Sequence, residues 1–111
     1  MVRYALAAVL AFSAAPALAA DGKALFEMQC KMCHGGSPIA PSLVGVLGRP
    51  IASTSFAYSP GLKAKGGKWT AASLDAFLKS PPAFAPGTKM PISVADPAAR
   101  TAIIGYLKTL K

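Results

Sequence analysis

The sequence contains only two cysteines, one histidine and four acidic residues among its 111 positions. A structural zinc site usually needs four cysteine or histidine ligands in spaced pairs, so we predict no such site. We find no internal repeat, no low-complexity linker and no alternation of strand and helix patterns, which argues against a thioredoxin-like fold. Lysine and arginine together number 12, so the formal net charge is +8. These features predict one small, basic domain.

The N-terminal segment has the pattern of a secretory signal peptide. Arg3 supplies a positive charge, and the stretch Tyr4–Ala15 is apolar. Ala17-Leu18-Ala19 then offers small residues at the spacing that a signal peptidase recognises. The alternative is an uncleaved membrane anchor, although the apolar run is short for a spanning helix of about 20 residues. We therefore predict a signal peptide over residues 1–20.

Cleavage after Ala19 or Ala20 would leave residues 21–111 as the mature domain. The cleaved segment contains a single charged side chain, Arg3, so the net charge falls only from +8 to +7. A chain of this length buries a modest apolar core. A large, flat, apolar cofactor would supply the missing interior.

The most informative motif is the C-x-x-C-H run Cys30-Lys31-Met32-Cys33-His34. This spacing is typical of covalent haem attachment. Two thiols on a helical turn can each form a thioether with one haem, and the adjacent imidazole can then bind the iron. We predict one haem c, attached through Cys30 and Cys33, with His34 as an iron ligand. A disulfide between the cysteines fits the spacing too, but it would leave His34 without a role.

A second iron ligand has to come from methionine, because the chain has no other histidine. The thioether sulfur of methionine is a soft donor that suits haem iron. Met28 and Met32 lie beside or within the attachment motif, on the wrong side of the ring. Met90 lies in the turn-rich segment Ala85–Pro91, far along the chain. We therefore predict His34 and Met90 as the two metal ligands.

The apolar spacing predicts an all-α domain. The expected helices are Gly22–Cys33, Ala71–Lys79 and a C-terminal helix that begins at Asp96-Pro97. Thr70 is the expected cap of the second helix, and Pro81-Pro82 should end it. Residues 34–69 lack a sustained period, so we expect ordered loops with at most a short helix near Ser59–Lys65.

With these motifs, the chain resembles the class I cytochromes c, the small soluble type that includes mitochondrial cytochrome c and bacterial cytochromes c2. Gly22 and Phe26 match the N-terminal helix of that family, and Ile103 and Tyr106 match the C-terminal helix. Gly105 should permit close approach of these helices. The resemblance implies a cytochrome c fold, in which the terminal helices cross and one further helix and long loops wrap around the haem.

The resemblance also implies roles for residues outside the attachment motif. Pro41-Ser42-Leu43 and Gly48-Arg49 match a family stretch in which the proline carbonyl accepts a hydrogen bond from the proximal histidine. Pro41 should therefore orient His34. Tyr58 and Trp69 match positions that, together with Arg49, hold a haem propionate.

The match continues in the second half of the chain. The segment Pro86-Gly87-Thr88-Lys89-Met90 is that of the family's ligand loop. Leu62 and Phe77 stand where many members carry a polar side chain and a tyrosine near the methionine sulfur. We expect a drier pocket there.

Filled axial positions leave the iron no open site, so we expect a periplasmic single-electron carrier that cycles between Fe(II) and Fe(III), and not an enzyme. Two alternatives stay open. The chain could be a cytochrome subunit of a periplasmic dehydrogenase or oxidase, or it could be a ligand-binding or peroxidatic haem protein if Met90 is not bound.

The basic surplus predicts acidic partner surfaces on redox proteins. A bc1 complex, a terminal oxidase, a photosynthetic reaction centre and a dehydrogenase all fit. Lys31 and Lys89 should lie near the exposed haem edge, and further lysines extend the positive field: Lys23, Lys63, Lys65, Lys68 and Lys79. We expect a monomer, with neither nucleic acid binding nor stable membrane insertion.

Overall fold

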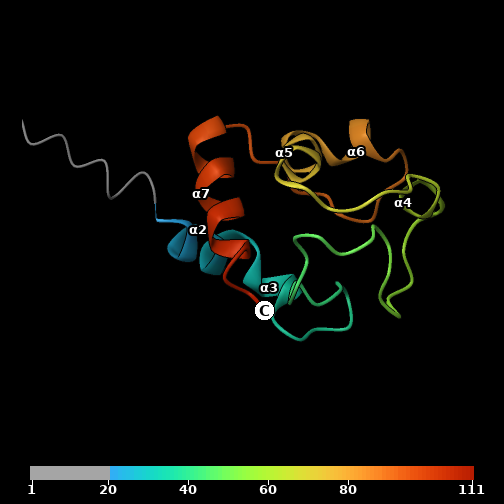
Figure 1. Cartoon of the computed structure of the whole chain (residues 1–111), viewed down its shortest axis with the longest axis horizontal. Coiled ribbons are helices and arrows are strands. Elements are labelled where there is room, and N and C mark those ends of the chain that lie inside the picture. The colour runs from blue at the N-terminus through green and yellow to red at the C-terminus, as the bar shows by residue number, and fades with distance from the viewer. Residues whose placement is uncertain (1–20) are drawn as a thin grey trace, which may run out of the picture.

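The structure, a computed structural model, describes residues 21–111. The predicted signal peptide, residues 1–20, and its cleavage positions lie outside the described residues. The described chain is helical, and its helices, labelled as in Figure 1, are α2 (Gly22–Gln29), α3 (Lys31–His34), α4 (Pro60–Lys63), α5 (Ala71–Lys79), α6 (Pro81–Phe84) and α7 (Pro97–Leu107). Extended pairing within residues 21–111 is limited to an isolated bridge between Pro50 and Lys68. The predicted all-α fold is confirmed.

Capping side chains set the starts of the long helices. Asp21 accepts a hydrogen bond from a first-turn backbone N–H of α2. Thr70 caps α5 in a reciprocal capping box with Ser73, and Asp96 caps α7 directly before Pro97. Such caps satisfy N–H groups that have no partner inside the helix. The starts predicted at Thr70 and Asp96 are confirmed.

Two predicted boundaries differ from the structure. The expected helix Gly22–Cys33 is interrupted at Cys30, where the N–H of Cys33 bonds to the Cys30 carbonyl at 3.2 Å and tightens the chain. Pro81 follows the end of α5 as expected, but it also begins α6, because the first turn of a helix does not need the N–H that proline lacks. Four helices, α3 to α6, therefore lie between the terminal pair, where the sequence predicted Ala71–Lys79 and at most a short helix near Ser59–Lys65.

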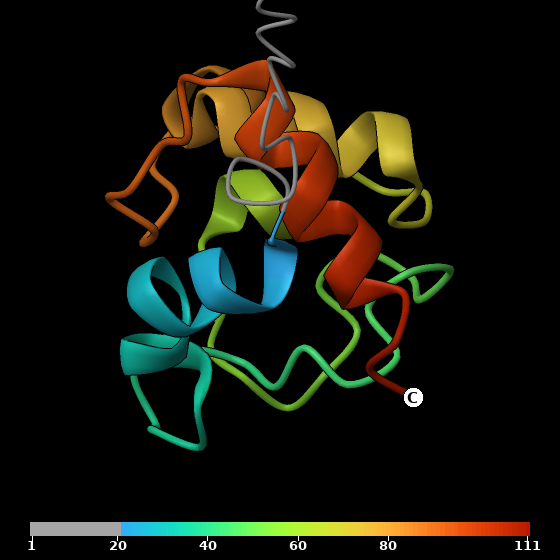
Figure 2. The same ribbon diagram turned by 90° about the vertical axis from the view of Figure 1, so that its left-hand side faces the viewer.

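The terminal helices α2 and α7 cross in close contact, as Figures 1 and 2 show. A Cβ atom on Gly22 would overlap the carbonyl oxygen of Ala102 and lie 2.6 Å from its carbonyl carbon, so only glycine fits. The rings of Phe26 and Tyr106 pack beside this point, with centroids 5.1 Å apart. Gly105 was expected to allow the approach, but a Cβ atom there would meet no other atom within 4 Å. The expectation was wrong for Gly105, and Gly22 fills that role.

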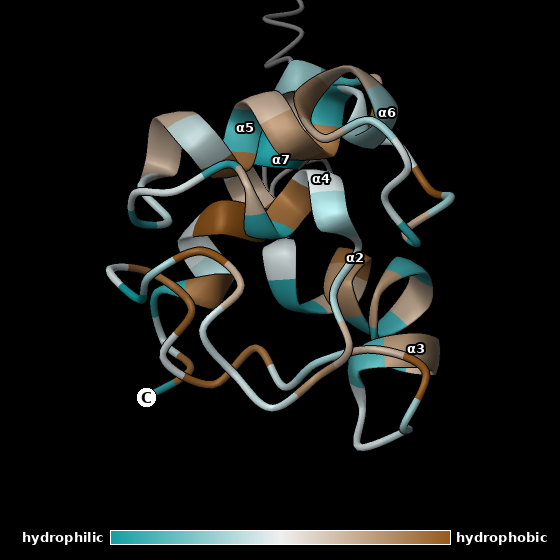
Figure 3. Cartoon of the chain, turned by 90° about the vertical axis from the view of Figure 1, so that its right-hand side faces the viewer, coloured by the Kyte–Doolittle hydropathy of each residue, from teal (hydrophilic) through white to brown (hydrophobic). Residues whose placement is uncertain are grey.

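Main-chain hydrogen bonds hold the irregular segment between α3 and α4 against the rest of the domain. The N–H of Gly48 donates to the Trp69 carbonyl at 2.7 Å, and the N–H of Trp69 donates to the Arg49 carbonyl at 2.9 Å. The hydropathy colours of Figure 3 show apolar stretches along the loops as well as on the helices. Loops and helices therefore both contribute to the interior. No helix within residues 21–111 is long and apolar enough to cross a membrane.

Gly22→Ala should lower the free energy of unfolding by about 1–3 kcal/mol, because the added methyl group overlaps the Ala102 carbonyl. Gly105→Ala is the matched control on the facing helix. It meets open space and should be neutral or stabilising by up to about 1 kcal/mol, since alanine favours helix over glycine. Urea unfolding measures both. Equal effects of the two changes would contradict the contact assigned to Gly22.

Candidate haem-binding site

A cavity of about 340 Å³ lies between the helices and the loops. Its walls include Phe26 of α2, Phe77 of α5, Ile103 of α7 and Leu62 of α4, all of which are buried. Ligand sites are typically apolar cavities of this kind with a few convergent polar groups. The core of the domain is therefore built around a space that suits an apolar group.

All of the residues predicted to form the site line this one cavity. They are Cys30, Cys33, His34, Pro41, Arg49, Tyr58, Trp69 and Met90. Helix α3 and the turn before it carry the thiols and the imidazole, whereas Met90 comes from the loop between α6 and α7. Segments far apart in the sequence thus bring two thiols, an imidazole and a thioether to a common space.

The imidazole of His34 has a defined tautomer. Its Nδ1 lies 2.9 Å from the carbonyl oxygen of Pro41. A carbonyl oxygen can only accept, so Nδ1 carries the proton and donates this hydrogen bond. The neutral ring then has its lone pair on Nε2, the nitrogen that is free to bind a metal ion. This geometry suits an iron ligand.

The thiols of Cys30 and Cys33 are free and half-buried. Burial raises the pKa of the Cys30 thiol, and the charge of the neighbouring Cys33 raises it further. Redox-active dithiols instead depend on a cysteine with a lowered pKa, and the pKa shift at Cys30 has the opposite direction. No group of three or more histidine, cysteine or acidic side chains within residues 21–111 could hold a metal ion by itself.

The loop that carries Met90 begins with a type II turn over Ala85–Thr88. The N–H of Thr88 donates to the Ala85 carbonyl at 3.0 Å, and Gly87 has a φ of 81°. Proline followed by glycine is the sequence that this turn requires. Met28 and Met32 face solvent instead, with exposed fractions of 75% and 84%. Met90 is the methionine that the described structure places at the cavity.

Two lysines tie this loop to the segment around α4. Lys89 Nζ donates to the Ala57 carbonyl at 2.6 Å, and Lys65 Nζ donates to the Phe84 carbonyl at 3.1 Å. The ammonium group of Lys65 also lies 4.2 Å from the centroid of the Phe84 ring. These lysines were predicted only as parts of a positive surface, and their sequence neighbours give no signal of a structural role.

Gly61 allows the same two segments to touch. A Cβ atom on Gly61 would overlap the Pro86 carbonyl oxygen and lie 3.3 Å from the carbonyl carbon. Sequence reasoning missed this residue, because a glycine after proline indicates a turn but does not reveal what packs against it. The Met90 loop therefore rests directly on the backbone of α4.

Arg49 lines the cavity and has one buried donor without a partner in the described part of the chain. Its Nη1 donates to the carbonyls of Ser42 and Val44 at 3.0 and 3.2 Å. Its Nε is buried and finds no hydrogen-bond partner among residues 21–111. An unpaired buried donor of this kind costs about 1–3 kcal/mol.

Tyr58 and Trp69 are two further lining residues whose side chains carry a polar atom. Both side chains are buried and line the cavity, and the Tyr58 hydroxyl forms a hydrogen bond with the Thr54 hydroxyl. A haem has a flat apolar ring and carboxylate groups at one edge. The apolar walls, the thiol pair and the unused Arg49 donor fit such a group.

Comparisons with known proteins agree with this fit. The cytochrome c family model matches residues 19–111. The chain is 41% identical over 96 residues to cytochrome c of Tetrahymena pyriformis. The matched region covers 83% of this chain and 88% of that protein. It is 42% identical over 94 residues to the c-type cytochrome cy of Rhodobacter capsulatus, over 80% of this chain but only 47% of that protein.

A solved structure shows the same architecture. Cytochrome cH from Methylobacterium extorquens superposes with a TM-score of 0.74 at 36% sequence identity. The match covers 82% of this chain and 97% of that protein. At this identity the similarity extends beyond the fold to the sequence itself.

Cys30→Ser and Cys33→Ser should each leave the haem held by a single thioether or lost on extraction, and the double variant should retain none covalently. Mass spectrometry of the denatured, purified protein measures the attached mass. Met32→Ser, within the same motif, is the control and should keep both thioethers. Full covalent retention in the double variant would exclude attachment through these thiols.

Proposed function

The chain belongs to the cytochrome c family, and from that premise we propose that it is a periplasmic single-electron carrier whose haem iron is bound by His34 and Met90. The family's cofactor is haem c, held covalently by a cysteine pair, and Cys30 and Cys33 are that pair in this chain. Bound haem c supplies an iron that gains or loses one electron. The observation that carries the proposal is that His34 and Met90, from separate segments, line one cavity.

The side chains around the cavity suit electron transfer better than catalysis. The hydrogen bond to Pro41 holds His34 with Nε2 free, and Met90 offers a soft sulfur that favours the reduced ion. If His34 and Met90 both held the iron, no coordination position would be left for an external substrate. The proposed role is therefore that of a carrier and not of an enzyme.

Apolar packing should keep water away from the thioether. Leu62 and Phe77 are 7% and 9% exposed and line the cavity with Met90. Neither side chain can hold a water molecule by a hydrogen bond. The drier pocket expected from the sequence thus stays a prediction, which these two side chains support.

The positive charge of the domain supports acidic redox partners. A net charge near +7 for the mature chain would steer encounter with an acidic surface and make the rate depend on salt. Lys65 and Lys89 contribute charge, but their ammonium groups are bound to main-chain carbonyls. Lys31, next to Cys30, is exposed and is the strongest candidate for direct partner contact.

Size distinguishes a free carrier from a subunit. Export by residues 1–20 would release the domain into the periplasm, where gel filtration of a native extract should find it as a monomer. Elution with a dehydrogenase or oxidase would instead support the subunit alternative.

Met90→Ala should open the iron to external ligands, because the sulfur donor is removed from the cavity. Ferric protein should then bind imidazole or cyanide rapidly, its reduction potential should fall, and its peroxidase activity should rise. The matched control is Met32→Ala, which removes the same chemical group from a side chain that is 84% exposed. Absorbance spectroscopy with a potentiometric titration measures both variants.

The proposed ligand pair fails under either of two results. One is a Met90→Ala spectrum and potential equal to those of the unchanged protein. The other is high-spin ferric iron in the unchanged protein with immediate binding of imidazole, which would favour the peroxidatic alternative.

Reduction by an acidic partner protein should slow by about tenfold or more from low to physiological salt if electrostatic steering operates. Lys31→Gln should reduce the low-salt rate constant more than Lys111→Gln, although both remove one charge. Stopped-flow absorbance measures the rates. Equal effects would show that only the net charge matters and would remove Lys31 from the contact surface.

A further inference from the structure

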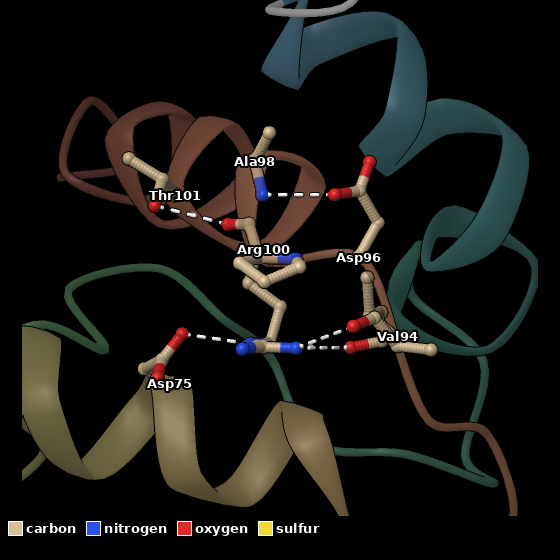
Figure 4. Close-up of polar contacts among 8 residues, drawn as sticks. Asp75, Val94, Asp96, Ala98, Arg100 and Thr101 are labelled. Carbon is tan, nitrogen blue, oxygen red and sulfur yellow. Dashed lines mark hydrogen bonds and ion pairs between the residues drawn. The ribbon is translucent and has the colours of Figure 1, made fainter.

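Arg100 of α7 is a buried charge with three acceptors. Its side chain is 6% exposed, and Nε donates to the Asp75 carboxylate at 2.8 Å. Nη1 donates to the Val94 and Ala95 carbonyls at 2.9 and 3.0 Å. Figure 4 shows the guanidinium between Asp75 of α5 and the segment that leads into α7. One side chain thus joins two helices and the end of the Met90 loop.

The chain after Met90 has few other attachments. Pro91 and Ile92 line the cavity beside Met90 and Ser93 is exposed, and within the described residues the backbone of these three takes part in no hydrogen bond. The next fixed point is Val94, whose N–H donates to the Leu78 carbonyl at 2.8 Å and whose side chain is buried. The downstream end of the loop is therefore held at Val94 and Ala95.

Arg100 supplies two of the hydrogen bonds at this fixed point. On the upstream side, the loop is held independently by the turn at Ala85–Thr88 and by Lys89 on the Ala57 carbonyl. Met90 can reach fewer positions when its loop is anchored at both ends than when the loop is anchored at one end. Release of Val94 and Ala95 would therefore increase the freedom of Met90.

We propose that Arg100 is a positioning residue that retains the Met90 sulfur on the iron by clamping Val94 and Ala95 to α5. This inference rests on the proposed ligand pair. The planar guanidinium can direct separate N–H groups at a carboxylate and at carbonyls, which the single ammonium group of lysine cannot do at the same positions. The Asp75 carboxylate neutralises the buried charge of Arg100 and orients its guanidinium group.

The central test is imidazole binding to the ferric holoprotein. An external ligand binds only the fraction of molecules whose sulfur is off the iron, so its apparent affinity rises with that fraction. Arg100→Gln should raise the apparent imidazole affinity by about tenfold or more, since charged hydrogen bonds to the clamp are lost. The absorption that reports sulfur–iron ligation should weaken in parallel.

A second readout does not depend on the iron. Hydrogen exchange of the Val94 amide should accelerate in Arg100→Gln more than that of amides in the middle of α5. Asp75→Asn keeps the carbonyl bonds of Arg100 and should change both readouts in the same direction but less. Arg100→Lys should fall between the unchanged protein and Arg100→Gln.

Ile104→Val controls for general loss of stability. Ile104 is buried on α7 and is not among the residues that line the cavity. At denaturant concentrations where its stability equals that of an Arg100 variant, its imidazole affinity should stay near that of the unchanged protein. An equal rise in both variants would overturn the positioning role.

The outcomes separate this inference from the ligand assignment. If the unchanged protein lacks sulfur ligation, the ligand pair and the role of Arg100 fall together. If it has sulfur ligation and Arg100→Gln leaves imidazole affinity unchanged, the inference about Arg100 alone is wrong. If neither Arg100 variant yields holoprotein, Asp75→Asn decides, and an affinity equal to that of Ile104→Val overturns the proposal.

Discussion

Attachment of a flat cofactor to one short helical turn is the constraint on which the rest of the structure depends. Cys30, Cys33 and His34 lie within five consecutive positions, so a haem attached there would have one edge and one face fixed by this short stretch of chain. Every other contact must come from segments that reach the same plane. Buried side chains from α2, α5 and α7, among them Phe26, Phe77 and Ile103, accordingly face a common cavity and do not fill it.

Cationic side chains donate hydrogen bonds to main-chain carbonyls in the irregular parts of this domain. Loops leave carbonyl groups without the partners that helices provide, and buried carbonyls need donors. Arg49, Lys65, Lys89 and Arg100 each donate to main-chain carbonyls of segments that are distant or irregular. The basic surplus thus has two uses, since part of it can guide partners while part of it holds the loops around the site.

The sequence was sufficient for the features that depend on local chemistry. The C-x-x-C-H run, the caps at Thr70 and Asp96, and the Pro-Gly turn before Met90 are short patterns with their own physical causes. Elimination selected Met90 as the candidate second ligand, because the chain has so few metal-binding side chains. Met90 does line the cavity. The family resemblance then added Pro41, Arg49, Tyr58 and Trp69, all of which line the cavity.

Contacts between distant segments could not be predicted from the sequence in the same way. Gly22 and Gly105 are both helical glycines on the crossing pair, and only the packing shows which one faces a carbonyl. Arg100 has no neighbour in sequence that indicates burial, because its partners Asp75 and Val94 come from other elements. The contact of α2 with α7 can form only after α7 has been synthesised.

Synthesis proceeds from the N-terminus, so the thiols of Cys30 and Cys33 exist well before α7. Bond formation to the porphyrin can therefore precede its enclosure by the terminal helices.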